Sequence, residues 1–148
     1  MAAAGDGTAF IFQADPRVFT LSVHAASNFP ARKQRSDLDV ALPDGTADEG
    51  YMAAAAGALT QCLERFQPDL VLYDAGVDVH AADDLGCLDI SDGGLLRRDM
   101  MVLDTCVGMG LPVAGVVGGG YAMDLDVLAD RHICLHQAAL AVWEQHAL

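Results

Sequence analysis

The sequence predicts a single α/β domain built on a parallel sheet. Three short, nearly continuous apolar runs have the character of strands: residues 18–23 (VFTLSV), 70–73 (LVLY) and 112–117 (PVAGVV). Such unbroken apolar character is typical of parallel strands that are covered on both faces. Stretches with helical character separate the runs, and this alternation of strand and helix is the pattern of βαβ units.

In the first half of the chain, the strand expected at 18–23 is rich in β-branched and aromatic residues, which favour extended structure. Prolines, a glycine and several charges in residues 25–45 predict one long loop, and loops of that length inside compact domains are often functional. The sequence TADE at 46–49 has the form of a capping box. It predicts a helix that continues through an alanine-rich stretch to about Phe66.

The second half repeats this alternation. A Pro-Asp pair precedes the strand expected at 70–73, and a Ser-Asp pair predicts the N-terminal cap of a helix over 91–109. The strand expected at 112–117 runs into three glycines. A last helical region extends from about Asp124 towards the C-terminus, and we expect it to break near His132.

Composition restricts the class of protein. The chain has 148 residues, which fits one domain, and a formal net charge of −13, which argues against a nucleic-acid-binding surface. No apolar run reaches the about 18 residues that predict a membrane span. The cysteines are widely spaced without a CxxC pair, which predicts buried thiols in a reducing, cytoplasmic or nuclear compartment. They are Cys62, Cys87, Cys106 and Cys134.

Polar groups follow each of the three expected strands, at residues 22–24, 74–78 and 118–121. Because ligands of open parallel sheets bind beyond the carboxyl ends of the strands, we expect these groups to meet at one edge. They are an imidazole, two carboxylates and a phenol, together with glycines that let backbone approach a ligand closely.

The carboxylate of Asp78 has two interpretations. It is a hard oxygen ligand for a metal ion, or a loop aspartate that caps nearby backbone N–H groups. His80 is a candidate second ligand, but the D-x-H spacing is permissive. We expect Asp83 and Asp84 to brace the loop rather than to bind metal.

Tyr121 ends a GGGY turn and is a candidate donor to a developing oxyanion, or else an aromatic plug over the sheet edge. The glycine run lacks the spacing and the lysine of a phosphate-binding loop. His132 and His136 have zinc-ligand spacing, but without the glutamate of HExxH a helix face is favoured. His24 reads as a satisfied polar residue at a strand end.

Five blocks of the chain resemble the zinc-dependent histone deacetylase family, and most of all its class IV and bacterial deacetylase-like branch. They occupy residues 5–12 (GDGTAFIF), 15–24 (DPRVFTLSVH), 28–46 (NFPARKQRSDLDVALPDGT), 68–88 (PDLVLYDAGVDVHAADDLGCL) and 110–124 (GLPVAGVVGGGYAMD). The resemblance implies a three-layer α/β/α fold with a parallel sheet, shared with arginases. Residues 1–148 would then be the C-terminal part of one such domain, incomplete at its N-terminal side.

The resemblance also implies roles for individual residues. Asp78 matches a ligand of the catalytic Zn²⁺, and Tyr121 matches the tyrosine that hydrogen-bonds the substrate carbonyl. The other matching positions are Phe29, Leu85, Gly119 and Gly120 in the acyl-lysine channel, Ser22 and the carbonyl of Val23 at a monovalent cation site for K⁺, and Asp6, which orients an active-site histidine, with His24 as a further supporting residue. The activity implied is the hydrolysis of acyl-lysine amides in a protein substrate, with a link to chromatin regulation.

The chain departs from the family pattern before its GDG sequence. The family has D-x-H-x there, with two further zinc ligands, whereas this chain has Met1 and Ala3. A thioether and a methyl group do not replace a carboxylate and an imidazole on Zn²⁺. The tandem catalytic histidines of the family lie still further upstream. We therefore expect a truncated form that is inactive alone, either a truncated gene or gene model or a short protein that has lost catalysis.

Two alternatives to protein deacylation remain open. The chain could be a non-catalytic interaction module, or its family site could hydrolyse small amides such as acetylated polyamines, whose positive charge suits the acidic chain. We expect an exposed sheet edge that causes oligomerisation or poor solubility, and no direct contact with nucleic acid or a membrane.

Overall fold

The structure, a computed structural model, describes residues 6–148, and it alternates helices with strands. Strands β1 and β2 pair in parallel, as do β3 and β4. The α/β class and the parallel pairing are therefore confirmed. In chain order the elements are α1 (Asp6–Phe12), β1 (Leu21–Ala25), β2 (Leu38–Leu42), α2 (Asp48–Arg65), β3 (Val71–Ala75), α3 (Asp92–Gly108), β4 (Val113–Val117) and α4 (Leu125–His146).

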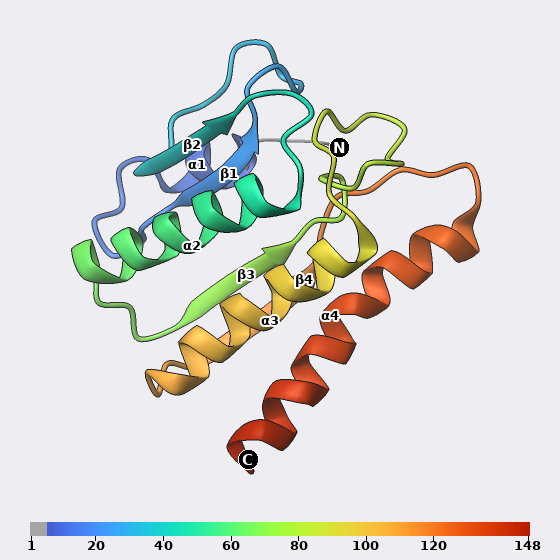
Figure 1. The fold of residues 1–148 in the computed structure, drawn as a ribbon. Helices are drawn as coiled ribbons and strands as arrows, with labels where there is room; N and C mark the ends of the chain where they lie inside the picture. The colour runs from blue at the N-terminus through green and yellow to red at the C-terminus, as the bar shows by residue number, and fades with distance from the viewer. Residues whose placement is uncertain (1–5) are drawn as a thin grey trace.

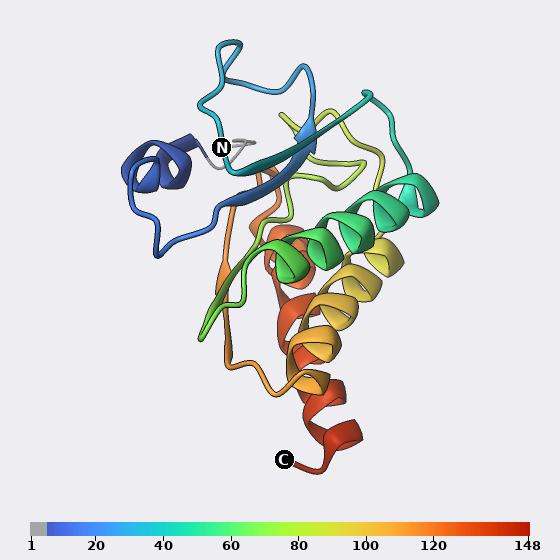
Figure 2. The same cartoon turned by 90° about the vertical axis from the view of Figure 1, so that its left-hand side faces the viewer.

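The helices form layers on the two sides of the strands. Figure 2 shows α2, α3 and α4 on one side and α1 on the other. Helix α2 packs on β1 and β2 and also contacts α3, while α3 and α4 lie side by side along β3 and β4 (Figure 1). The carboxyl ends of β3 and β4 coincide, because Ala75 is in register with Val117. The loops that follow these two strands therefore start at the same edge.

The pair β3–β4 is not covered on both faces within the described residues. Leu72 is 73% exposed and Val116 is 50% exposed. These side chains share a face, because Leu72 pairs with Ala114 and Val116 pairs with Asp74, two residues further along each strand. The burial on both faces that the apolar runs predict is thus not found here.

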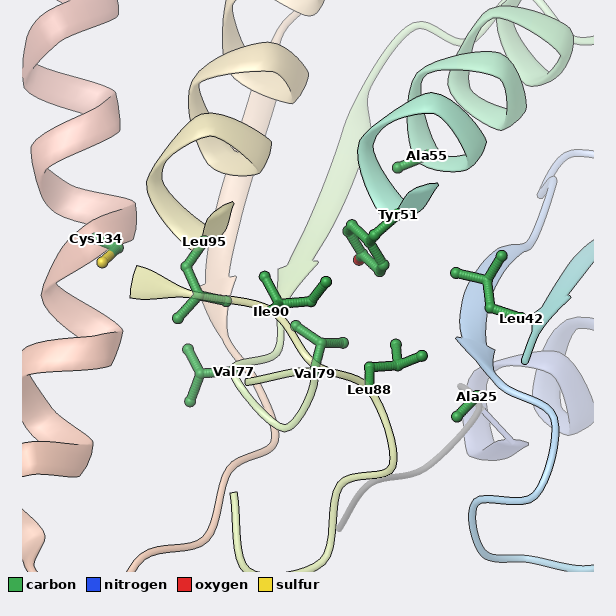
Figure 3. Close-up of a cluster of buried hydrophobic side chains, with 10 residues drawn as sticks. All are labelled: Ala25, Leu42, Tyr51, Ala55, Val77, Val79, Leu88, Ile90, Leu95 and Cys134. Carbon is green, nitrogen blue, oxygen red and sulfur yellow. The ribbon is translucent and has the colours of Figure 1, made fainter. Parts of the chain in front are cut away.

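One cluster of buried side chains connects β1, β2 and the loop after β3 with helices α2, α3 and α4, as Figure 3 shows. Its members are Ala25, Leu42, Tyr51, Ala55, Val77, Val79, Leu88, Ile90, Leu95 and Cys134. The loop between β3 and α3 supplies Val77, Val79, Leu88 and Ile90. Burying one side chain of this size stabilises the folded protein by about 1.5–3 kcal/mol. Core packing therefore anchors the backbone on both sides of Asp78, which itself is half-buried.

Two predicted elements are wrong. Residues 38–42, inside the expected loop 25–45, form β2. Its sequence LDVAL alternates apolar and polar residues only briefly. The prolines and charges on either side therefore made the whole segment resemble a loop. The break expected near His132 is absent, because α4 runs without interruption from Leu125 to His146 and contains neither Pro nor Gly. Helix α1 was not expected at all.

Of the two predicted helix caps, one is confirmed and the other is wrong. Ser91 caps α3 as predicted, since its Oγ accepts a hydrogen bond from the backbone N–H of Gly94 at 3.0 Å. The capping box expected at 46–49 is wrong: α2 begins after Ala47, and the hydroxyl of Thr46 donates instead to the carbonyl of Pro43 at 2.6 Å.

All four cysteines are free, with Cys106 and Cys134 buried and Cys62 and Cys87 half-buried. Burial raises the pKa of the Cys62, Cys106 and Cys134 thiols, which keeps them protonated. In the range 6–148, every helix is too short or too polar to cross a lipid bilayer.

Candidate functional site

The loop after β3 and the glycine loop after β4 are hydrogen-bonded to each other. The backbone N–H of Val77 donates to the carbonyl of Gly119 at 2.7 Å, and the N–H of Asp84 donates to the carbonyl of Tyr121 at 3.2 Å. The carboxylate of Asp83 accepts from the N–H of Tyr121 at 2.6 Å. Asp78 and Tyr121 therefore belong to two loops that form one unit at a single edge of the strands.

Glycines allow these loops to approach so closely. A Cβ on Gly118 would lie 2.8 Å from the backbone nitrogen of Gly76 and would also overlap the carboxylate of Asp74. A Cβ on Gly76 would lie 2.9 Å from Oδ1 of Asp78. Gly120 adopts φ = 155°, in the region that disfavours side chains. Gly118 is thus required by backbone packing against the loop of Asp78, and Gly120 by its backbone conformation.

Asp78 lies in an electrostatic environment that opposes its ionisation. Its pKa is raised to about 6, first because burial removes water from the carboxylate and then because the charges of Asp83 and Asp74 repel it. A nearby cation would lower the pKa of Asp78 and stabilise its carboxylate, because the positive charge would offset both effects.

Asp83 braces the loop, as the sequence predicts. Its Oδ1 accepts from the backbone N–H groups of Leu85 at 2.9 Å and Gly86 at 2.7 Å, while its Oδ2 holds Tyr121. Asp84 is exposed, and within the described residues its side chain takes part in no hydrogen bond, so it does not brace the loop through its carboxylate.

His80 is engaged at both ring nitrogens. Nδ1 accepts from the N–H of Ala82 at 3.0 Å, and Nε2 lies 3.2 Å from Oδ1 of Asp92. Burial, followed by the charge of Arg131, lowers the pKa of His80 and favours the neutral ring. The ring therefore has no free nitrogen for a metal, and its role in this structure is to fix the loop to the start of α3.

Strand β1 presents a second polar group at its carboxyl end. Oγ of Ser22 lies 2.9 Å from Nδ1 of His24, and both side chains are buried. Burial lowers the pKa of His24, whereas the charges of Asp39 and Asp6 act in the opposite direction. His24 is satisfied by this contact, and the monovalent cation expected at Ser22 and the carbonyl of Val23 stays a prediction.

Asp6 connects α1 to the loop between β1 and β2. Its Oδ1 accepts a hydrogen bond from the N–H of Gln34 at 2.9 Å. The apolar side chains expected in a substrate channel are exposed: Phe29 is 67% and Leu85 58% exposed, and Tyr121 is 40% exposed. These three side chains are exposed to solvent, and their place in a substrate channel stays a prediction.

The sequence reasoning missed a buried ion pair beneath the site. Nη1 of Arg98 donates to the carbonyl of Gly76 at 2.6 Å, and its guanidinium is 2.9 Å from Asp99. The hydroxyl of Tyr73 donates to the same carboxylate at 2.5 Å. Arg98 thus fixes the backbone two residues before Asp78. The available signal was its spacing from Leu95, three residues earlier on the buried face of α3.

The donors of residues 6–148 do not make a complete metal centre. Nowhere in this range do three His, Cys, Asp or Glu side chains gather in a way that could hold a metal ion, and this includes His132 and His136. Asp78 is the one residue in the range that the family resemblance implies as a zinc ligand. Met1 and Ala3, which occupy the other two ligand positions of the pattern, lie outside the described residues.

Known proteins are similar to this chain over most of its length. Residues 3–136 match the model of the histone deacetylase domain. An uncharacterised protein of Picosynechococcus is 55% identical over 139 residues, which is 94% of this chain and 46% of that protein. Histone deacetylase 2 of Arabidopsis thaliana is 32% identical over 110 residues, which is 72% of this chain and 28% of that protein. The chain thus spans less than half the length of these relatives.

Solved structures show the same fold. The histone deacetylase Clr3 superimposes with a TM-score of 0.74 at 24% identity, covering 95% of this chain and 26% of Clr3. An acetylpolyamine aminohydrolase from Burkholderia pseudomallei also reaches a TM-score of 0.74, at 23% identity, covering 93% of this chain and 42% of that enzyme. The present chain therefore has the fold of one part of these larger domains.

Proposed function

The chain belongs to the histone deacetylase family, and from that premise we propose that it supplies the C-terminal part of a zinc-dependent site that hydrolyses acyl-lysine amides. The observation that carries the proposal is that two loops are hydrogen-bonded to each other at the carboxyl ends of β3 and β4. One loop brings Asp78, a carboxylate that a nearby cation would stabilise because burial and like charges raise its pKa, and the other brings the phenol of Tyr121.

Zinc fits this half of the site only in part. When bound, Zn²⁺ supplies Lewis acidity that polarises the amide carbonyl and acidifies water. Among the described residues, Asp78 alone is proposed as a ligand, and complete structural zinc sites have apparent binding energies of about 10–16 kcal/mol that fall by several kcal/mol with each missing ligand. We therefore propose that the remaining ligands and the acid–base histidines come from a second, N-terminal segment, and that the 148-residue chain alone is inactive.

The residues of this chain have distinct parts in the proposed site. Tyr121 donates a hydrogen bond to the substrate carbonyl oxygen, a contact that strengthens as negative charge develops there. Phe29 and Leu85 provide exposed apolar walls, and Gly119 and Gly120 allow the acyl-lysine chain to pass close to the backbone. The acidic net charge favours a cationic substrate such as a lysine-rich tail.

Reconstitution tests this proposal. The chain is mixed or co-expressed with the part of the Picosynechococcus relative that lies outside the 46% covered by this chain. We expect one bound zinc and hydrolysis of an acetyl-lysine peptide from the mixture, and neither from the 148-residue chain by itself. Stoichiometric zinc and turnover from the isolated chain would contradict the need for a second segment, and an inert mixture that has formed a stable complex would contradict the enzymatic proposal.

Tyr121→Phe in the reconstituted protein separates catalysis from binding. Removing a donor that acts mainly in the transition state should lower turnover by about 100-fold or more while the affinity for the peptide changes little. Leu85→Ala is the matched control, because it shortens an exposed wall without removing a donor, and it should act on affinity instead. Equal turnover in the Phe variant and the parent would show that the assigned role of Tyr121 is wrong.

An interaction module is the second candidate, favoured by the uncovered face of β3–β4. Leu72 and Val116 expose apolar surface there, and exposed apolar faces on parallel strands are sites of association. Here the chain would form an oligomer, or bind a full-length relative, without taking up zinc in any mixture. Zinc titration of the complex therefore separates the two candidates. Acetylated polyamine and acetyl-lysine peptide, compared as substrates, decide the substrate class.

A further inference from the structure

The ammonium group of Lys33 is enclosed by three backbone carbonyls. Its Nζ donates to the carbonyl oxygens of Ala26 at 2.9 Å, Asn28 at 2.5 Å and Pro30 at 3.1 Å. An ammonium has three N–H donors, so this arrangement uses all of them. Hydrogen bonds from a charged donor are also stronger than those between neutral groups. We call these four groups the Lys33 clamp.

The clamp acts on the backbone around Phe29. The carbonyl of Asn28 precedes Phe29 in the chain, and the carbonyl of Pro30 follows it. Lys33 therefore hydrogen-bonds to the backbone on both sides of Phe29. The third carbonyl, that of Ala26, lies directly after β1. Lys33 therefore connects the Phe29 segment to the end of a strand.

The position of Phe29 depends on such backbone contacts. Its ring is 67% exposed, so core packing does not fix it. The neighbouring contacts hold the ends of the loop: the N–H of Ala26 donates to the carbonyl of Leu42 at 2.8 Å, and the N–H of Gln34 donates to Asp6 at 2.9 Å. Between these ends, the N–H of Asn28 donates to the carbonyl of Ala25 at 3.2 Å and the hydroxyl of Ser27 donates to Asp44 at 2.7 Å, while the Lys33 clamp ties the backbone on both sides of Phe29.

Lys33 is also singular in the composition. It is the one lysine of the chain, among 8 basic residues in a protein of net charge −13. The flanking Arg32 and Arg35 are exposed, and within the described residues their side chains donate no hydrogen bond. The loop thus contains three cations, of which Lys33 alone is tied to its backbone.

We propose that Lys33 is a positioning residue that holds Phe29 at the wall of the acyl-lysine channel. This inference rests on the proposed function for the role of Phe29, but the clamp itself does not. Replacing Lys33 removes three charge-assisted hydrogen bonds, frees the 26–30 segment and leaves the Phe29 ring without a fixed place. The consequence for an enzyme is weaker binding of the acyl-lysine chain, with the chemical groups at Asp78 and Tyr121 undisturbed.

Two measurements on the 148-residue chain test the clamp without any activity. Acylation by an amine-reactive ester, mapped by peptide mass spectrometry to separate Lys33 from the α-amino group, reports on the single lysine, and we expect Lys33 to react at least about tenfold more slowly in the folded chain than in urea. Hydrogen exchange of the Asn28 amide, which donates to the carbonyl of Ala25 at 3.2 Å, should accelerate at least about tenfold in Lys33→Met, because each charge-assisted bond lost corresponds to roughly that factor. Arg32→Met makes the same change of charge in the same loop and should leave exchange unaltered.

Lys33→Arg guards against a variant that fails to fold. It keeps the cation and several donors, but its planar group does not match three carbonyls arranged around one ammonium, so its exchange rates should fall between those of the parent and Lys33→Met. Equal acylation rates in folded and unfolded chain, or equal exchange in Lys33→Met and Arg32→Met, would overturn the clamp.

A double-mutant cycle in the reconstituted enzyme tests the action through Phe29. Lys33→Met should raise KM for the acetyl-lysine peptide about fivefold or more with kcat within about twofold, and the same change made in a Phe29→Ala background should have no further effect. Additive effects would show that Lys33 does not act through Phe29. If no combination of halves turns over peptide, the proposed function fails and the positioning of Phe29 for substrate fails with it, while acylation and exchange still decide the clamp.

Discussion

Replacing Asp78 with asparagine should stabilise the isolated chain at neutral pH. The folded protein raises the pKa of this carboxyl from 3.8 to about 6 by burial and by the neighbouring charges of Asp83 and Asp74. At pH 7 the folded state therefore contains a carboxylate that ionises more easily in the unfolded chain. Asp78→Asn keeps the shape of the side chain and removes that cost.

The magnitude follows from the size of the pKa shift. A shift of about 2 units at about 1.36 kcal/mol per unit sets an upper limit of about 3 kcal/mol. Because Asp78 is only half-buried, solvent screens part of this, and we expect the free energy of unfolding to rise by about 1–2 kcal/mol. The gain should be complete above pH 6, where the folded carboxyl is ionised. It should shrink as the pH falls through 6 and disappear near pH 4, where the folded carboxyl of the parent is protonated.

Urea unfolding of the parent and the variant at several pH values between 4 and 8 measures this difference. Asp84→Asn is the matched control, because Asp84 is an exposed carboxylate in the same loop and its removal should change the free energy of unfolding by less than about 0.5 kcal/mol. A stabilisation by Asp78→Asn that does not vary with pH, or a loss of stability at pH 7, would refute the electrostatic explanation.

Two further substitutions test the packing beneath the site by the same unfolding measurement. Gly118→Ala should destabilise the chain by about 2 kcal/mol or more, since its methyl group meets backbone and a carboxylate, whereas Gly57→Ala, in open space within α2, should stabilise by about 0.5–1 kcal/mol; equal effects would refute the close-approach reasoning. Arg98→Met should cost about 3–5 kcal/mol because it leaves the buried Asp99 carboxylate without its cation, and Arg97→Met, on the exposed side of α3, should cost less than about 1 kcal/mol. Similar losses in both arginine variants would show that burial of the pair is not what matters.

The local sequence predicted the elements whose pattern is strong. The apolar runs before residues 74 and 118 became β3 and β4 within one residue or two, and Ser91 caps α3. The rule that parallel strands end at a shared edge then predicted that the loops of Asp78 and Tyr121 lie together. Strand β2 was not predicted, because the weak alternation of its five residues is a poorer signal than the charges around it.

The contacts that organise the site could not be predicted, because they join residues far apart in sequence. Asp83 was expected to brace its loop, yet nothing in the pattern specifies that it accepts from Tyr121, 38 positions later. The same holds for Arg98 and the carbonyl of Gly76, 22 positions apart. Even the Lys33 clamp, whose partners lie within seven residues, depends on a loop conformation that no periodicity describes.

In the proposed function, this site is one part of a zinc centre whose remaining ligands come from a second segment. A partly desolvated carboxylate faces two others, and glycines allow the loop of Tyr121 to close on it. The buried carboxylate lowers the stability of the chain taken by itself, which is the usual relation between function and stability. If Asp78→Asn stabilises the chain while zinc binding in the reconstituted mixture is lost, one carboxylate will have been shown to oppose folding and to support metal binding for the same electrostatic reason.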